Sequence, residues 1–179
     1  MTYEVDITAT PQFLDVDLSV LRHAVVQALH IESVAGAVLS FSLVDNKTIH
    51  AVNHAYLQHD FPTDVISFQL DWRHPTRNSP KSDAERRAAG AHIEGEIMVS
   101  VEYAESEAAR LGWELQSELT LYSVHGMLHV CGYDDQEIVQ QQIMRARETF
   151  ILEQLGIPKI PRDPDTAIQS TELTQDILE

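Results

Sequence analysis

The segment ELQSELTLYSVHGMLHVCGYDD, residues 114–135, holds the pattern that decides the fold. Residues 114–131 are apolar almost all round, which predicts a helix buried on most of its sides. Gly132 follows as the expected left-handed terminator of that helix. His125 and His129 are four residues apart, so they lie on one helical face with Cβ atoms about 5–6 Å apart. The segment therefore predicts a central helix that aims two imidazoles at one point.

A metal site is one interpretation of the histidine pair. Zn²⁺ binds histidine nitrogens at about 2.0–2.1 Å, and a catalytic zinc usually has three protein ligands and an open position for water. Because a glycine after the helix lets the chain turn back, Asp135 can supply the third ligand from the opposite side. Two histidines in an otherwise apolar helix also need polar partners, and a metal ion satisfies both at once.

A purely structural interpretation is open as well. The sequence DDQE at residues 134–137 fits a capping box, with Asp134 as N-cap and Glu137 at the third helical position. Asp135 would then only interact with the helix dipole. A zinc peptidase is not favoured, because Gly126 stands where that chemistry needs a glutamate base. Cys131 is out of phase with the histidine face and is predicted to be a small core residue.

Composition limits the class of protein. A chain of 179 residues fits one domain with a full core. No stretch approaches the roughly 18 apolar residues of a membrane helix, and the first residues lack the pattern of a signal peptide. One cysteine cannot form an internal disulfide, so we expect a cytoplasmic protein. The net charge of −16 argues against a protein that grips nucleic acid over its whole surface.

Strand and helix patterns alternate along the chain. We expect strands at residues 3–10, 37–44, 63–70 and 95–101. We expect helices that begin at Asp17, that run from Asp45 to about Tyr56, that span 101–111 and 114–131, and that run from near Asp134 to about 155. This mixture predicts the α/β (α+β) class, with a small four-stranded sheet surrounded by about five helices. Residues 1–155 would form one domain. Residues 71–93 would form a long loop, and residues 156–179 an acidic, disordered tail.

Three motifs resemble those of the YbeY endoribonucleases. The first, HGMLHVCGYDD at 125–135, matches the family pattern His-Gly-x-Leu-His followed by Gly-Tyr-Asp-His at every fixed position but the last. The others are NHAYLQHDFPTDVISF at 53–68 and GEIMVS at 95–100. They occur in family order, and the resemblance covers roughly residues 1–155. It implies a mostly parallel sheet with the metal site in a cleft. It also implies a metal-dependent hydrolase of single-stranded RNA, acting in 16S rRNA 3′-end maturation and ribosome quality control.

The resemblance also implies a ligand set. His125 and His129 would bind one divalent ion, foremost Zn²⁺, and Asp135 stands where the family usually has a third histidine. Aspartate is an accepted zinc ligand. Its negative charge would make metal-bound water, the expected attacking group, harder to ionise, and would shift the preference toward harder ions such as Mn²⁺. The sequence identifies no general base.

Other residues have a functional and a structural interpretation side by side. Leu57 stands where many family members carry an arginine, and a protonated His59 could bind phosphate in its place or be an ordinary surface histidine. Asp64 could line the cleft or stabilise a turn. Glu96 could orient a ligand histidine from behind the metal, or make a structural hydrogen bond.

The segment 72–93 has a net charge of +3 and is the one cationic stretch in the chain. We expect it to steer RNA phosphates toward the metal, or else to be a solvated loop. Its cations are Arg73, Arg77, Lys81, Arg86 and Arg87. The expected partners are single-stranded RNA or rRNA and the small ribosomal subunit or ribosome-associated proteins. Two competing functions are a ribosome-assembly factor with a structural metal and a metallohydrolase on another substrate.

Overall fold

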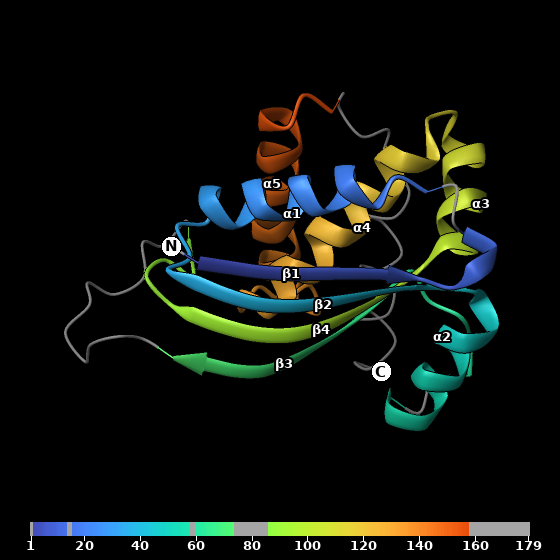
Figure 1. Cartoon of the computed structure of the whole chain (residues 1–179), viewed down its shortest axis with the longest axis horizontal. Coiled ribbons are helices and arrows are strands. Elements are labelled where there is room, and N and C mark those ends of the chain that lie inside the picture. Colours follow the sequence, from blue (N-terminus) through green and yellow to red (C-terminus); the bar gives the residue numbers. More distant parts are fainter. Residues whose placement is uncertain (1, 14–15, 58–59, 74–85, 158–179) are drawn as a thin grey trace, which may run out of the picture.

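A computed structural model describes residues 2–13, 16–57, 60–73 and 86–157. Four strands form one sheet in the order β1-β2-β4-β3 (Figure 1). β1 (Thr2–Ala9), β2 (Gly36–Val44) and β4 (His92–Ser100) run parallel, and β3 (Val65–Arg73) pairs antiparallel with β4 at the edge. The prediction of a small, mostly parallel sheet is confirmed.

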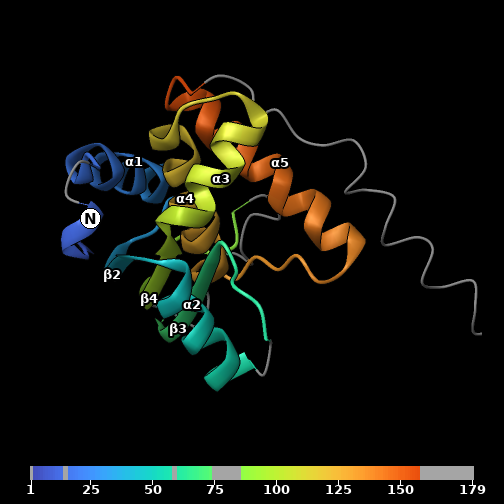
Figure 2. The same cartoon turned by 90° about the vertical axis from the view of Figure 1, so that its right-hand side faces the viewer.

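Five α-helices accompany the sheet within the described residues, as predicted. They are α1 (Leu18–Ile31), α2 (Asn46–Val52), α3 (Val101–Leu111), α4 (Leu115–Val130) and α5 (Ile138–Gln154). A 3-10 turn, η1 (Pro11–Phe13), follows β1, and a π-helical turn, η2 (Asn53–Leu57), extends α2. α1 and α4 cover one face of the sheet, and α5 packs against α4 (Figure 2). α2 covers part of the opposite face, where Ile49 packs with Ile66.

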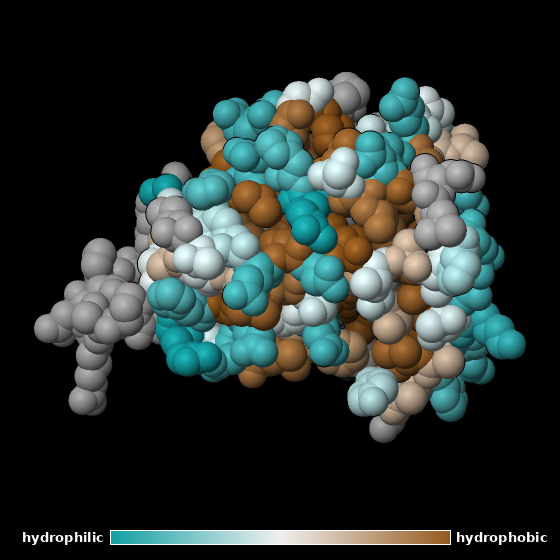
Figure 3. All heavy atoms as spheres, in the orientation of Figure 1, coloured by the Kyte–Doolittle hydropathy of each residue, from teal (hydrophilic) through white to brown (hydrophobic). Residues whose placement is uncertain are grey.

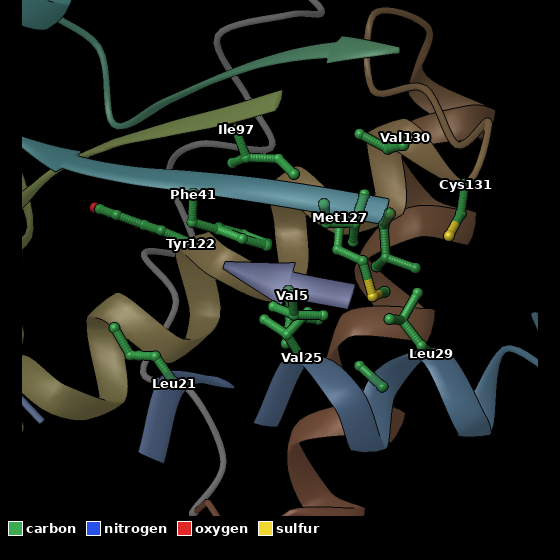
Figure 4. Close-up of a cluster of buried hydrophobic side chains, with 14 of the residues drawn as sticks. Val5, Leu21, Val25, Leu29, Phe41, Ile97, Tyr122, Met127, Val130 and Cys131 are labelled. Carbon is green, nitrogen blue, oxygen red and sulfur yellow. The ribbon is translucent and has the colours of Figure 1, made fainter. Parts of the chain in front are cut away.

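The centre of the fold is α4, as its apolar sequence predicts. Phe41 and Ile97 of the sheet, Leu29 of α1 and Met127 of α4 belong to one buried cluster (Figure 4). Gly126 lets α4 approach the sheet closely, because a Cβ atom there would lie 2.6 Å from Ile97 Cγ2. This close approach brings the adjacent histidine face beside β3.

Helix ends follow the predicted capping residues in most places. Asp17 accepts hydrogen bonds from the backbone of Ser19 and Val20 at the start of α1, and Asp45 accepts one from Thr48 at the start of α2. Gly132 has φ +84° just after α4, in the left-handed region that glycine adopts without strain. These residues fix where the buried elements begin and end.

The predicted capping box before α5 is wrong. The helix begins at Ile138 after Glu137, not near Asp134, and Glu137 makes no side-chain capping bond. Asp134 Oδ1 instead accepts hydrogen bonds from the backbone of Asp135, at 2.8 Å, and Gln136, at 3.2 Å. The chain uses these residues for a turn that returns Asp135 toward α4, so they are not available for the first turn of a helix.

The predicted loop at 71–93 is shorter than expected. β3 continues to Arg73 and β4 already begins at His92, because Trp72 pairs with Ile93 and packs on the core. Residues 74–85 lie outside the described part of the chain, as do residues 158–179 of the predicted tail.

The surface mixes polar and apolar side chains. Apolar side chains remain visible among polar ones on the face that carries α1 and β1 (Figure 3). Ile7, Leu18 and Val26 line a shallow groove between these two elements. Among the described residues, no helix combines the length and the apolar character needed to cross a membrane.

Candidate metal centre

Both histidine rings are held by hydrogen bonds at Nδ1. His129 Nδ1 lies 3.1 Å from the backbone carbonyl oxygen of Tyr133. A carbonyl only accepts, so His129 Nδ1 must donate. His125 Nδ1 lies 2.5 Å from Oε1 of Glu148, whose carboxylate accepts in the same way. In the neutral rings, each Nε2 therefore carries the free lone pair.

The two free lone pairs converge on one point. The Nε2 atoms of His125 and His129 are 3.0 Å apart, and carboxylate oxygens of Asp135 lie 3.8 Å from each. Tetrahedral coordination at about 2.0–2.1 Å separates donor atoms by about 3.3 Å, so these spacings bracket the value for zinc. Two neutral imidazole lone pairs this close repel each other unless a cation lies between them. The donor set therefore fits a divalent metal ion.

The electrostatics of the pair agree with that geometry. Burial alone would lower the pKa of His125, but the hydrogen bond and charge of Glu148, with the charges of Asp64 and Asp135, raise it above its ordinary value. Burial, followed by the charge of His125, lowers the pKa of His129. Of the two rings, His125 is therefore the one that binds a proton more readily, and a metal ion would compete with protons for the Nε2 atoms.

The turn after α4 places the third donor. Gly132 reverses the chain, and Arg87 Nη1 donates a 2.7 Å hydrogen bond to the Gly132 carbonyl oxygen. The Arg87 guanidinium also lies over the ring of Tyr133, 4.9 Å from its centroid, and contacts Gln140 of α5. These contacts fix the turn that carries both the carbonyl partner of His129 and the carboxylate of Asp135.

A buried ion pair supports the turn from behind. Glu32, at the end of α1, has no exposed surface and accepts hydrogen bonds from Arg147 of α5 at 2.6 and 3.0 Å. The Tyr133 hydroxyl donates to the same carboxylate at 2.9 Å. The position of the Tyr133 backbone therefore depends on α1 and α5 together.

The donors open into a cavity of about 620 Å³. Its walls come from α4, from α5 and from the edge strand β3 with the residues before it. Asp64 lines this cavity, as one interpretation predicted, and also stabilises a turn, as the other predicted. Its Oδ1 accepts from the Thr63 hydroxyl, at 2.9 Å, and from the Val65 backbone, at 2.8 Å.

The other predicted residues lie elsewhere or outside the described part. Glu96 is exposed on β4 between Gly95 and Ile97, which face α4; side chains alternate along a strand, so Glu96 points away from the histidines. Arg73 forms an ion pair with Asp71 and lines a separate cavity. His59, Arg77 and Lys81 are not among the described residues, nor is the side chain of Leu57.

Arg86 and Arg87 are predicted to steer RNA phosphates, and in the structure both guanidinium groups donate hydrogen bonds within the protein. Arg86 donates a 2.7 Å hydrogen bond to the Ser33 hydroxyl, so that guanidinium helps to hold the chain near the end of α1. The prediction for Cys131 concerns packing. Cys131 is fully buried in the core, and burial raises the pKa of its thiol well above its ordinary value. The prediction that Cys131 is a core residue is confirmed.

Glu148 is the main site residue that sequence reasoning missed. It is only 4 % exposed and shares the buried face of α5 with Met144, Ile151 and Leu152. The signal was present in the sequence: one carboxylate interrupts an apolar stripe at helical spacing, and a buried charge needs a partner. What the sequence did not reveal is which residue of α4 it meets.

Fold and site together define a class: an α/β protein with a cluster of two histidines and one carboxylate that could hold a metal ion and that opens into a cavity. The family model described as Endoribonuclease YbeY matches residues 7–156. The chain belongs to the YbeY endoribonuclease family.

Relatives support the family along most of the chain. Endoribonuclease YbeY of Roseiflexus castenholzii is 37% identical over 158 residues, which cover 87% of this chain and 94% of that protein. Endoribonuclease YbeY of Carboxydothermus hydrogenoformans is 35% identical, and the match covers 86% of this chain and 99% of that protein. The solution structure of a Thermotoga maritima protein superposes with a TM-score of 0.52 at 21% sequence identity. The match covers 89% of this chain and 97% of that chain, which shows a similar fold.

Proposed function

We propose that the protein is a metal-dependent endoribonuclease that hydrolyses phosphodiester bonds of single-stranded RNA at the His125, His129 and Asp135 centre. The observation that carries the proposal is the convergence of two Nε2 lone pairs, 3.0 Å apart, and a carboxylate at the wall of a cavity. The family, whose members are named endoribonucleases, supplies the substrate class.

The cavity favours a catalytic over a structural metal. Structural zinc sites are closed by four protein ligands, whereas catalytic sites have three and an open position. Among the described residues, three donors converge here, and the same three side chains line the cavity. A bound ion would act as a Lewis acid that activates water for attack on phosphorus and offsets negative charge on the phosphate.

The protein side chains have separate tasks in this scheme. Glu148 and the Tyr133 carbonyl oxygen fix the proton of each ring at Nδ1, so both Nε2 atoms face the ion. Asp135 adds the one negative charge among the ligands, which offsets part of the charge of the ion. Zn²⁺ suits this mixed nitrogen and oxygen set, and Mn²⁺ is the alternative that the carboxylate favours.

We propose 16S rRNA, at its 3′ end, as the substrate in the cell, with a role in ribosome quality control in the cytoplasm. A net charge of −16 repels free RNA, which suits an enzyme that meets its substrate on the small ribosomal subunit or through ribosome-associated proteins. The cationic segment around Arg77 and Lys81 is proposed to help by attracting RNA. The single domain would comprise residues 1–155.

The test is cleavage of an end-labelled single-stranded RNA by wild type and by His129→Ala, each with and without a chelator. His23→Ala, which removes an exposed histidine of α1, is the matched control. We expect cleavage only by wild type and His23→Ala, and only without chelator. Equal cleavage by all samples would identify a contaminating nuclease.

A different outcome would support the assembly factor. If no sample cleaves RNA, and wild type and His23→Ala, but not His129→Ala, bind metal and lose thermal stability with chelator, the metal is structural. Cleavage of small phosphoesters but not of RNA would instead support a metallohydrolase with another substrate.

A further inference from the structure

Arg145 lies on the wall of the metal cavity. It belongs to α5 and shares one helical face with Gln141 and Glu148, both of which line the same cavity. Among the described residues that line it, Arg145 alone carries a permanent positive charge, whereas Asp64, Asp135 and Glu148 carry carboxylates. The half-buried guanidinium thus stands in an otherwise acidic enclosure.

Its guanidinium is not used to hold the fold. Arg87 and Arg147 donate hydrogen bonds that fix the turn after α4 and the end of α1. Arg145, by contrast, forms no ion pair and no side-chain hydrogen bond with any residue in the described ranges; only its backbone carbonyl accepts, from Thr149. Five N–H donors in a planar fork are therefore available to a ligand.

The charge of the cavity indicates which ligand. A polyanion entering this site meets three carboxylates on a chain of net charge −16. A divalent ion offsets part of that repulsion at one point of the wall. The Arg145 guanidinium offsets more of it at a second point, and its fork matches the paired oxygens of a phosphate.

We propose that Arg145 binds a backbone phosphate of the RNA that lies in the metal cavity, so that the strand is held at two points, by the metal centre and by this guanidinium. The inference rests on the proposed function, because it takes RNA as the occupant. It assigns a substrate-binding role to a residue of α5, outside the ligand set.

The first test is RNA affinity, measured by fluorescence anisotropy with a labelled single strand in the presence of saturating Zn²⁺, with a denaturing gel after each titration to confirm that the strand is intact. Arg145→Ala should bind about tenfold to a hundredfold more weakly than wild type, since it loses a charged hydrogen bond. The slope of log affinity against log salt should fall by about 0.7, the value for one phosphate contact on a single strand. Arg145→Lys should recover part of the affinity.

Arg22→Ala is the matched control. It removes the same charge from an exposed position of α1, away from the cavity, where Arg22 lies 3.7 Å from Asp6. Its affinity and salt slope should equal those of wild type. A loss equal to that of Arg145→Ala would show a general effect of net charge and would overturn the inference.

A second test locates the contact. Cleavable RNAs carry one neutral methylphosphonate, protected by a neighbouring 2′-deoxy sugar, at each position around the cleaved bond in turn. At one position the substitution should reduce cleavage by wild type but leave cleavage by Arg145→Ala unchanged, because the variant has already lost the contact. Additive losses at every position would overturn the inference.

The outcomes separate this inference from the proposed function. If wild type cleaves RNA and Arg145→Ala matches its affinity and salt slope, the inference fails and the function stands. If wild type binds but does not cleave RNA, the function fails, and the affinity series still decides for Arg145. If wild type does neither, both fail. If Arg145→Ala loses RNA affinity and also binds less metal or unfolds at a lower temperature, and Arg145→Lys does not restore the affinity, the role of Arg145 is structural and the inference is overturned.

Discussion

At the scale of single residues, the second hydrogen bond of each histidine matters as much as its position on α4. A neutral imidazole binds a metal through one nitrogen and donates through the other. Here a carboxylate and a carbonyl oxygen accept the protons at Nδ1, so both Nε2 atoms are acceptors facing the same point when the two rings are neutral. The site is therefore set for a cation before the cation arrives.

This arrangement predicts the effect of Glu148→Gln. The amide keeps the size of the side chain but removes the charge behind His125, so metal affinity should fall about tenfold to a hundredfold. Competition with a chelating dye measures it. Glu153→Gln, an exposed position on the same helix, is the control and should leave affinity unchanged. Equal affinity in Glu148→Gln would contradict the role given to this carboxylate.

The sequence predicted the site at this scale only in part. The pair His125 and His129 follows from helical spacing, and the return of Asp135 follows from a glycine turn. Glu148 lies 23 residues from its partner His125, and the distance between them depends on how α5 packs against α4. Local spacing carries no information about that packing, so the contact could not be predicted.

At the scale of elements, the close packing of α4 on the sheet at Gly126 determines the position of the histidine face. The sequence predicted the strands and the caps because each depends on neighbouring residues. It misplaced the start of α5, because Asp134 satisfies the backbone of a turn instead of a helix. It also ended β3 too early, because the pairing of Trp72 with Ile93 depends on a distant strand.

Gly126→Ala tests this packing of α4 on the sheet. Helix propensity favours alanine over glycine by about 1 kcal/mol. However, the added Cβ would lie 2.6 Å from Ile97 Cγ2 and 3.1 Å from Ser67 Oγ. Overpacking of a core typically destabilises by about 1–3 kcal/mol, so we expect a net loss of stability in urea denaturation and weaker metal binding. A more stable variant would show that α4 does not press on the sheet.

At the scale of the whole molecule, Glu32 and Arg147 join parts of the chain that are 115 residues apart. Breaking a buried pair by removing one partner costs about 3–5 kcal/mol, whereas removing both costs much less. The single variant Arg147→Leu should therefore be less stable than the double variant that combines Glu32→Gln with Arg147→Leu. Urea denaturation of the two single variants and the double variant measures the coupling, and additive losses would contradict it.

The distribution of the supports along the chain has a consequence for biosynthesis. The Tyr133 carbonyl oxygen that holds His129 depends on Glu32 near the beginning and on Arg147 near the end, and His125 depends on Glu148. A growing chain emerges with its N-terminus first. Both imidazoles thus leave the ribosome before the helix that helps to orient them, so the site is completed only after α5 has been synthesised. A prematurely ended chain without α5 carries the histidines and Asp135 but lacks Glu148 and Arg147, whose contacts help to hold the two rings in place.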